Sequence, residues 1–149
     1  MKVLLIYPKY PDTFWSFKHI LKFISRKAAF PPLGLLTVAA MLPADWEKRL
    51  IDINVKPLQE NDLEWADTVF ISAMIVQEES AREAIALCKT KGKTVVAGGP
   101  LFNTQWKSFN NVDHFVLNEA EITLPRFLKD LKKGNCKRIY TSSKRPAIS

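Results

Sequence analysis

Cysteine and histidine are scarce in this chain, which has two of each among 149 residues. Cys88 falls in a helical pattern and Cys136 in a polar stretch, so the two lack the spacing of a disulfide framework or of a CxxC metal motif. Ligands this few and this scattered argue against a zinc or iron–sulfur site built by the chain alone. A cofactor that brings its own metal remains compatible with this composition.

Long apolar runs are also missing. The chain has no stretch of about 18 apolar residues that could cross a membrane. Residues 1–8 lack the length and the small-residue cleavage site of a secretory signal. We therefore expect a cytoplasmic protein without a membrane partner.

Basic residues exceed acidic ones, and the formal net charge is +7. Such a charge favours contact with the phosphates of nucleic acids, but the basic residues fall into two groups. One group lies near the start of the chain, at Lys18, Lys22, Arg26 and Lys27. The other crowds the C-terminal end, at Lys129, Lys132, Lys133, Lys137, Arg138, Lys144 and Arg145. The second group is typical of a solvated helix face and tail, so we expect no nucleic-acid partner.

Short apolar runs alternate with helical patterns along the chain. A hydrophobic fraction of 47% and a charged fraction of 25% are typical of a folded domain. Strands buried on both faces are predicted at 2–8, 48–54, 67–76, 93–100 and 113–119. Helices are predicted at 32–42, 78–92 and 119–134. This alternation predicts an α/β fold, a flavodoxin-like (Rossmann-like) doubly wound sheet of five parallel strands in the order 2-1-3-4-5.

Two details stay open. Pro125 lies inside the last predicted helix or marks its true start, because proline is tolerated in a first turn. The connection from 9 to 31 is long for a strand-to-helix loop, and its aromatic residues either cap the core or form a lid or docking surface. These residues are Phe14, Trp15, Phe17, Phe23 and Phe30.

The carboxyl ends of the predicted strands are the expected place for a ligand, because open parallel sheets bind ligands there. Candidates after the first strand are Tyr7, Pro8, Lys9 and Tyr10, and after the third strand they are Ser72, Ala73, Met74 and Ile75. Candidates after the last two strands are Gly98, Gly99, Pro100, Asn118, Glu119 and Glu121.

The adjacent glycines Gly98 and Gly99 lie in a chain that has only five glycines. Glycine permits positive φ and removes the Cβ that would keep a ligand away from the backbone. We expect the pair to form a floor for a large ligand, and a tight turn that requires glycine is the alternative. In the first case, valine in place of Gly99 blocks the ligand and leaves the fold intact.

Motifs for the common ligands and reactions of this architecture are absent. There is no GxGxxG for dinucleotides and no GxxxxGK[ST] for nucleoside triphosphates. Pro8 and Ser72 occupy positions where a phosphoacceptor domain would need acidic residues. No GxSxG elbow occurs, and His19 and His114 are the only histidines, so a serine triad has no support. His114 begins a strand, away from the expected site, and is predicted to be structural.

Five segments over nearly the whole chain match one family pattern in the family's order. They are "LLIYPKYP", "FPPLGLLTVAAML", "ISAMIVQ", "VVAGGPLFNT" and "VDHFVLNEAEITLPRFLKDL", the last with NEAE where the family more usually has GEGE. Through them the chain resembles the N-terminal cobalamin-binding domain of radical S-adenosylmethionine enzymes. Cobalamin-dependent methylases and the anaerobic magnesium-protoporphyrin IX monomethyl ester cyclases are members of that family.

The resemblance implies that cobalamin lies over the carboxyl ends of the sheet, with its nucleotide tail inserted toward the point where the strand order reverses. Residues that follow the third strand would line the tail and the corrin edge, the glycine pair would pass beneath the tail, and polar groups after the fifth strand would contact its sugar or the corrin amides. The implied set is the strand-end candidates above, together with Leu33 and Gly34 of the first helix.

Two departures from the cobalamin-binding pattern bear on function. Asp12 is followed by Thr13 and Phe14 and not by a DxHxxG motif, so cobalt is expected to have no histidine ligand from the protein, His19 included. No CxxxCxxC motif occurs, so this chain alone is not expected to be catalytic.

The resemblance also implies a domain organisation. We expect residues 1–141 to form the cobalamin-binding domain and residues 142–149 to be a linker toward a radical S-adenosylmethionine domain in cis. That domain would hold a 4Fe–4S cluster and S-adenosylmethionine, and the larger enzyme would carry out methyl transfer or cyclase chemistry. The alternative is a non-catalytic interaction domain of the same fold that has lost the cofactor.

Overall fold

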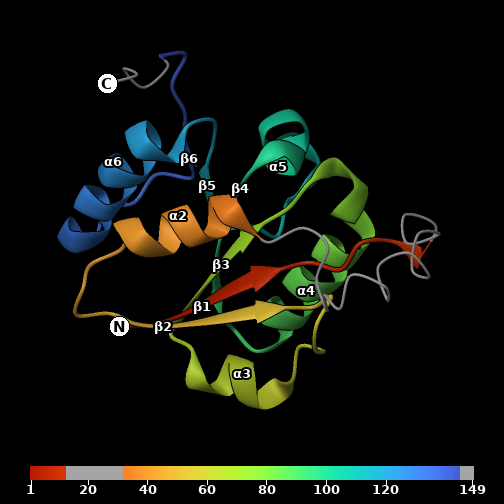
Figure 1. The fold of residues 1–149 in the computed structure, drawn as a ribbon. Coiled ribbons are helices and arrows are strands. Elements are labelled where there is room, and N and C mark those ends of the chain that lie inside the picture. Colours follow the sequence, from red (N-terminus) through yellow and green to blue (C-terminus); the bar gives the residue numbers. More distant parts are fainter. Residues whose placement is uncertain (13–31, 145–149) are drawn as a thin grey trace.

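Six parallel strands form one sheet in the computed structural model, which describes residues 1–12 and 32–144. Along the chain they are β1 (Lys2–Tyr7), β2 (Glu47–Asp52), β3 (Thr68–Ser72), β4 (Thr94–Gly98), β5 (His114–Val116) and β6 (Ile139–Tyr140). They lie side by side in the order β2-β1-β3-β4-β5-β6 (Figure 1). The predicted α/β class, the parallel pairing and the order 2-1-3-4-5 are confirmed, and β6 corrects the strand count from five to six.

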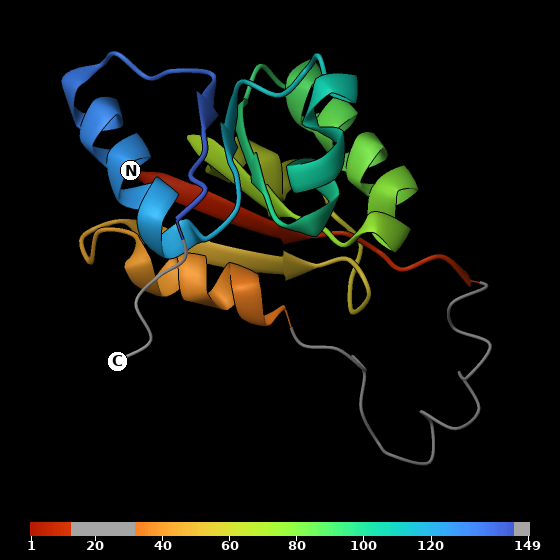
Figure 2. The same cartoon turned by 90° about the horizontal axis from the view of Figure 1, so that it is seen from above.

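Helices cover both faces of the sheet. Those of the described residues are α2 (Leu33–Met41), α3 (Glu60–Trp65), α4 (Glu78–Thr90), α5 (Pro100–Gln105) and α6 (Ala120–Lys133), with short 3-10 turns η2 (Ile75–Gln77) and η3 (Trp106–Ser108). Figure 2 shows α2 and α6 on one side of the strands and α4 and α5 on the other. This two-sided cover is what right-handed crossovers between parallel strands produce.

Two buried apolar layers, one on each face, form the core. Successive side chains of a strand point to opposite faces, so Val95 and Ala97 pack in one layer while Val96 packs in the other. The first layer includes Leu63 of α3, and the second includes Leu124 of α6. Burial on both faces explains why these strands are apolar at consecutive positions.

The edge strands differ from the expectation of strands buried on both faces. In β2 only Ile51 is fully buried, because this strand lies at the edge of the sheet, where helix cover is incomplete. Strand β6 has two residues, Ile139 and Tyr140, too few for an apolar run to predict it. The six-residue helices α3 and α5 were likewise too short to show a helical period.

Helix α6 begins at Ala120, one residue after the predicted start at 119, and Pro125 lies inside it. The predicted aromatic lid, the first basic group and His19 fall within 13–31, outside the described residues. Among the residues that the structure describes, no helix is long and apolar enough to span a membrane.

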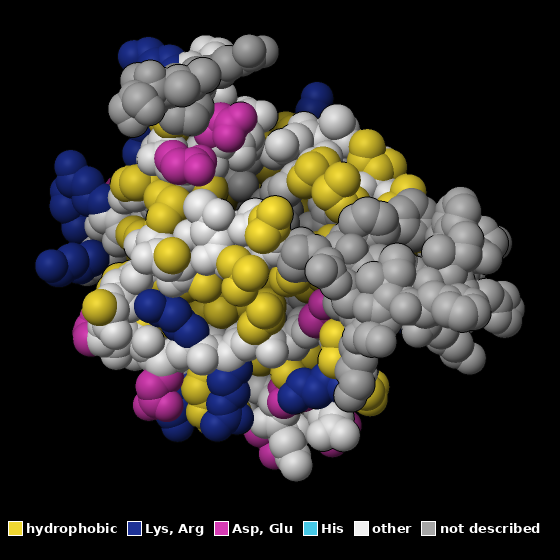
Figure 3. All heavy atoms as spheres, viewed as in Figure 1, with side chains coloured by type: hydrophobic (Ala, Val, Ile, Leu, Met, Phe, Trp, Pro, Cys, Tyr) yellow, Lys and Arg dark blue, Asp and Glu magenta, His cyan; other side chains and the backbone are white. Residues whose placement is uncertain are grey.

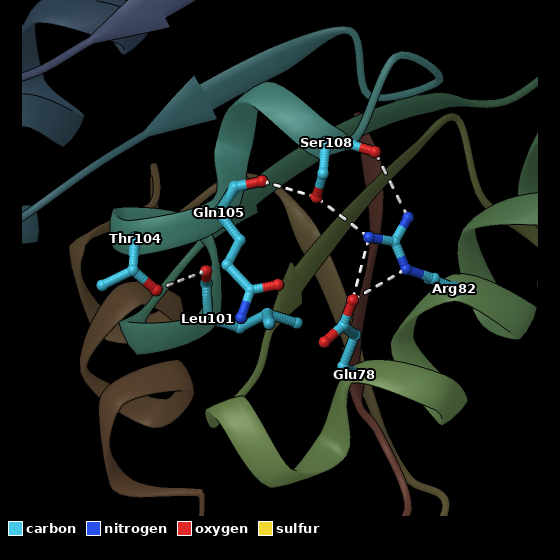
Figure 4. Close-up of polar contacts among 6 residues, drawn as sticks. All are labelled: Glu78, Arg82, Leu101, Thr104, Gln105 and Ser108. Carbon is cyan, nitrogen blue, oxygen red and sulfur yellow. Dashed lines mark hydrogen bonds and ion pairs between the residues drawn. The ribbon is translucent and has the colours of Figure 1, made fainter.

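Arg82 joins α4 to the connection between β4 and β5 (Figure 4). Its guanidinium donates to the Glu78 carboxylate from Nε at 3.0 Å and from Nη2 at 2.9 Å, and Nη2 also donates to Ser108 Oγ at 2.9 Å. The guanidinium carbon lies 4.0 Å from the centre of the Phe109 ring. These contacts hold the segment that follows Gly99 against α4.

The buried thiol of Cys88 predicts a loss of stability at alkaline pH. Burial raises the pKa of Cys88 from 9.0 to about 11. Between these values the thiol ionises in the unfolded chain but stays protonated in the folded one, so the free energy of unfolding falls as pH rises, by on the order of 2 kcal/mol. Urea unfolding of the wild type and of Cys88→Ala, at a pH below 9.0 and at a pH above about 11, tests this. The free energy of unfolding of the wild type should exceed that of Cys88→Ala by less at the higher pH. A difference that stays constant would contradict this account.

Candidate functional site

A cavity of about 230 Å³ lies at the carboxyl ends of β3, β4 and β5, between α2 and α6. Pockets that hold a drug-sized ligand commonly enclose about 300–1,000 Å³. The cavity can therefore enclose only part of a large ligand, and the remainder would stay outside it.

The lining combines a buried apolar part with an exposed polar part. The apolar part is formed by Leu35, Val38, Phe70, Ile71, Val96, Ala97, Val116, Ala120 and Leu124. Ser72, Asn118, Glu119 and Glu121 supply hydroxyl, amide and carboxylate groups, and the last three of these residues are exposed. Within the described part of the chain, the Ser72 hydroxyl has no hydrogen-bond partner, so it can donate to or accept from a ligand.

Gly98 and Gly99 form the floor of the cavity because β4 packs tightly between its neighbours. A Cβ at Gly98 would lie 2.6 Å from the Val116 carbonyl oxygen, and a Cβ at Gly99 would lie 2.6 Å from Ser72 Oγ. Gly99 also has a φ of 92° and begins α5, and its carbonyl accepts hydrogen bonds from Phe102 and Asn103. The added Cβ atoms would strike the protein itself, so both glycines are required by the fold.

This geometry corrects the expectation for valine at position 99. The Cβ of the valine would contact Ser72 and the backbone of Ala73, so the substitution would disturb the fold as well as the cavity. The turn that requires glycine, the alternative of the sequence analysis, accounts for the conformation of Gly99, and the floor that Gly99 contributes to the cavity follows from this turn.

Gly34 is different from the glycine pair. It lies in α2, lines the cavity, and has no heavy atom within 4 Å of the place where a Cβ would be. Glycine inside a helix costs about 0.5–1 kcal/mol relative to alanine. No packing constraint of the described residues requires this cost, whereas close approach of a ligand to α2 would.

Half of the predicted site residues meet at this cavity. Those that line it are Gly34, Ser72, Gly98, Gly99, Pro100, Asn118, Glu119 and Glu121. Those that do not line it are Tyr7, Pro8, Lys9, Tyr10, Leu33, Ala73, Met74 and Ile75. A position at the end of a strand could not distinguish the two groups. It predicts that a residue lies at the carboxyl ends of the strands, but not on which face of the sheet or beside which neighbouring strand it lies.

The segment after β1 is held in place by side-chain amides. The Pro8 carbonyl accepts from Gln77 Nε2 at 2.6 Å and from Asn54 Nδ2 at 3.0 Å, and the backbone N–H of Tyr10 donates to Asn54 Oδ1 at 2.9 Å. Gln77 is fully buried and also accepts from the Met74 N–H at 2.7 Å. These bonds fix the carboxyl ends of β1 and β3 relative to each other.

Tyr7 and Tyr10, on either side of Pro8 and Lys9 in sequence, are both buried, and their hydroxyl oxygens are 2.6 Å apart. Burial and the bond to Tyr10 raise the pKa of Tyr7 well above its ordinary value. Lys9 and Tyr10 line a separate depression of about 290 Å³, together with Glu79, Ser80 and Glu83.

An exposed apolar surface adjoins the cavity on α2. Leu33 is 67% exposed and Leu36 is 45% exposed. Met74 and Ile75, after β3, are also about half exposed. Figure 3 shows hydrophobic side chains gathered over α2, so this helix is apolar on its outer side as well as on the side that faces the sheet.

The sequence analysis missed the helix residues of the lining, among them Thr37, Val38 and Leu124. Helix positions that face a cavity have the same period as those that face the core, so the pattern carried no distinguishing signal. His114 lies at the first residue of β5, with Nδ1 2.8 Å from the Lys137 carbonyl. In the described ranges, no group of three or more His, Cys, Asp or Glu residues could hold a metal ion.

Comparison with known proteins identifies the family of the chain. A family model described as "B12 binding domain" matches residues 22–128. The chain is 42% identical to an uncharacterized methyltransferase of Synechocystis sp., over all of this chain and 28% of that protein. It is 28% identical to the hopanoid C-2 methylase of Rhodopseudomonas palustris, over 97% of this chain and 28% of that protein. No solved structure matches.

Gly99→Val is predicted to destabilise the fold. The substitution combines an unfavourable positive φ with a contact that the backbone of Ala73 cannot relieve, so we expect a loss of at least about 2 kcal/mol in the free energy of unfolding. Gly134→Val is the comparison variant, because Gly134 has a φ of 74° and a ψ of 22°, a less strained conformation for valine than the φ of 92° and ψ of 177° of Gly99, and has no atom within 4 Å of the added Cβ. Urea unfolding should show the larger loss for Gly99→Val, and equal losses would contradict the combined effect of backbone conformation and close approach at the end of β4.

Proposed function

Because the chain belongs to the B12-binding domain family, we propose that it binds cobalamin in the cavity between α2 and α6. The observation that carries this proposal is the cavity itself, which lies at the carboxyl ends of three parallel strands, where open sheets of this type bind ligands. Its volume suits one portion of a large cofactor, and its floor is glycine backbone that a ligand can approach closely.

The chemistry of the lining fits this cofactor. Cobalamin carries carboxamides around its corrin ring and hydroxyl groups on its nucleotide tail, and both kinds of group donate and accept hydrogen bonds. Ser72 would offer a hydroxyl, Asn118 an amide oxygen, and Glu119 and Glu121 carboxylates as acceptors. The buried apolar lining would contact the flat, uncharged portion of the tail.

Cobalamin, when bound, supplies methyl-carrier chemistry, and the chain contributes binding, orientation and exclusion of water. We propose that the protein gives cobalt no histidine ligand. His114 supports this, because it lies at the amino end of β5, whereas the cavity lies at the carboxyl ends of the strands. Asp12, Thr13 and Phe14 occupy the place of the missing DxHxxG motif.

The chain spans 28% of the length of the two relatives that it matches. Their names, a methyltransferase and a methylase, support the proposal that residues 1–141 are the cobalamin module of a larger methylase and that residues 142–149 lead to its next domain. We propose that this domain is a radical S-adenosylmethionine domain, which would hold the 4Fe–4S cluster and S-adenosylmethionine.

A non-catalytic interaction domain of the same fold is the second candidate. The exposed apolar residues of α2, Leu33 and Leu36, favour it, because apolar patches of this kind often mark contacts with another protein surface. Only the cobalamin-binding function requires a ligand in the adjoining cavity, so a binding measurement separates the two candidates.

Titration with hydroxocobalamin tests the proposed function. We expect the corrinoid to co-elute with the chain in gel filtration and its absorbance spectrum to change on binding. Gly34→Phe places a ring in open space beside the cavity, so it should lower the affinity at least about tenfold while the melting temperature stays the same or rises, since a helical glycine is removed.

Ala40→Phe is the control for this variant. Ala40 lies in the same helix and is exposed but does not line the cavity, so this variant should bind hydroxocobalamin like the wild type. Equal affinity of Gly34→Phe and the wild type would place the cofactor elsewhere. No binding to the wild-type chain would favour the interaction domain.

A further inference from the structure

Asn118 has an unusual backbone conformation at the end of β5. Its φ is 63°, and it is the one non-glycine residue with positive φ in the described part of the chain. Its backbone N–H donates to Asn103 Oδ1 of α5 at 2.8 Å. Glycine would adopt this conformation at lower cost, so the presence of asparagine points to a role for its side chain.

The side chain of Asn118 holds the segment that leaves β6. Its Nδ2 donates to Thr141 Oγ1 at 2.8 Å and to the Ser142 carbonyl at 3.1 Å. The neighbouring Leu117 N–H donates to the Tyr140 carbonyl at 2.8 Å, so the side-chain bonds continue the pairing of β5 with β6 beyond the last strand residue. Figures 1 and 2 both show the chain leaving β6 beside the start of α6.

The same amide borders the cavity. Both Nδ2 protons are committed to Thr141 and Ser142, which leaves Oδ1 as an acceptor that has no partner among the described residues. Asn118 is thus fixed by the segment after β6, it lines the cavity, and its Oδ1 stays available to a hydrogen-bond donor. A ligand amide or hydroxyl that donates to Oδ1 would hold the side chain in the orientation in which Nδ2 bonds to Thr141 and Ser142.

We propose that Asn118 is a positioning residue that ties the segment after β6 to the ligand cavity, so that a bound ligand and an ordered segment stabilise each other. The tether is a property of the chain without ligand, whereas its coupling to the ligand rests on the proposed function. Thermodynamic linkage makes the two effects equal in size. The factor by which a bound ligand favours the ordered segment is the factor by which the ordered segment raises the affinity for the ligand.

Trypsin cleavage after Lys144 measures the tether. This bond lies two residues beyond Ser142, and the next basic residue, Arg145, precedes Pro146, where trypsin cleaves poorly. Loss of two hydrogen bonds of ordinary net strength should accelerate cleavage about tenfold in Asn118→Gly, which keeps the backbone conformation without strain. Asn118→Asp has the same size and lacks both N–H donors, so it should behave similarly.

Thr141 provides the matched variants. Thr141→Val removes the acceptor and should accelerate cleavage about threefold, whereas Thr141→Ser keeps a hydroxyl and should be cleaved like the wild type. The double variant Asn118→Gly/Thr141→Val should be cleaved no faster than Asn118→Gly alone, because both changes remove the same contact. Wild-type cleavage rates in both Asn118→Gly and Thr141→Val, measured by mass spectrometry of this one bond, would overturn the tether.

Saturating hydroxocobalamin tests the coupling. Cleavage after Lys144 should slow in the wild type and not in Asn118→Gly, and the affinity of this variant for hydroxocobalamin should fall by at least the same factor, because it loses the Oδ1 acceptor as well as the tether. Binding that leaves wild-type cleavage unchanged would overturn the coupling and leave the proposed function standing. Absence of binding to the wild type would instead overturn the proposed function and the coupling with it, while the ligand-free variants still decide the tether.

Discussion

Strands β3, β4 and β5 lie so close that a Cβ at Gly98 would meet the Val116 carbonyl oxygen and a Cβ at Gly99 would meet the Ser72 hydroxyl, and the candidate site depends on this approach. Gly98 is paired with Ser72 on one side and Val116 on the other. At Gly99 the positive φ turns the chain directly from β4 into α5, whose Leu101 N–H donates to the Ala73 carbonyl. The floor of the cavity is therefore backbone held by hydrogen bonds, and a ligand can approach it without displacing side chains.

Side-chain amides fix the loops around this floor. Gln77 and Asn54 meet at the Pro8 carbonyl, and the Asn103 side chain accepts from the backbone N–H of Asn118, which joins α5 to the end of β5. An amide offers donors and an acceptor in one small group, so it can satisfy two backbone segments at once where the chain has no regular pairing. Because these loops are already ordered before a ligand binds, less conformational entropy is lost on binding.

The sheet could be predicted because burial on both faces makes a strand such as Val95 to Ala97 apolar at consecutive positions, and the helix start at Ala120 because acidic residues mark it. The site could be predicted only as far as the edge of the sheet. Tyr7 ends β1 and contacts Tyr10, and Lys9 follows β1 and contacts Ser80, away from the cavity. The contact of Lys9 with Ser80 joins residues far apart in sequence, and neither periodicity nor spacing predicts it.

The central claim is that cobalamin occupies the cavity on the face of α2 and α6. Methyl-selective NMR of the chain with and without hydroxocobalamin tests it most directly, because the two core layers carry separate methyl groups. The account predicts shifts for Leu35, Val38 and Leu124, which line the cavity, and none for Leu63 and Ile85 in the layer on the other face. Shifts confined to Leu63 and Ile85, or none with the cofactor bound, would contradict it.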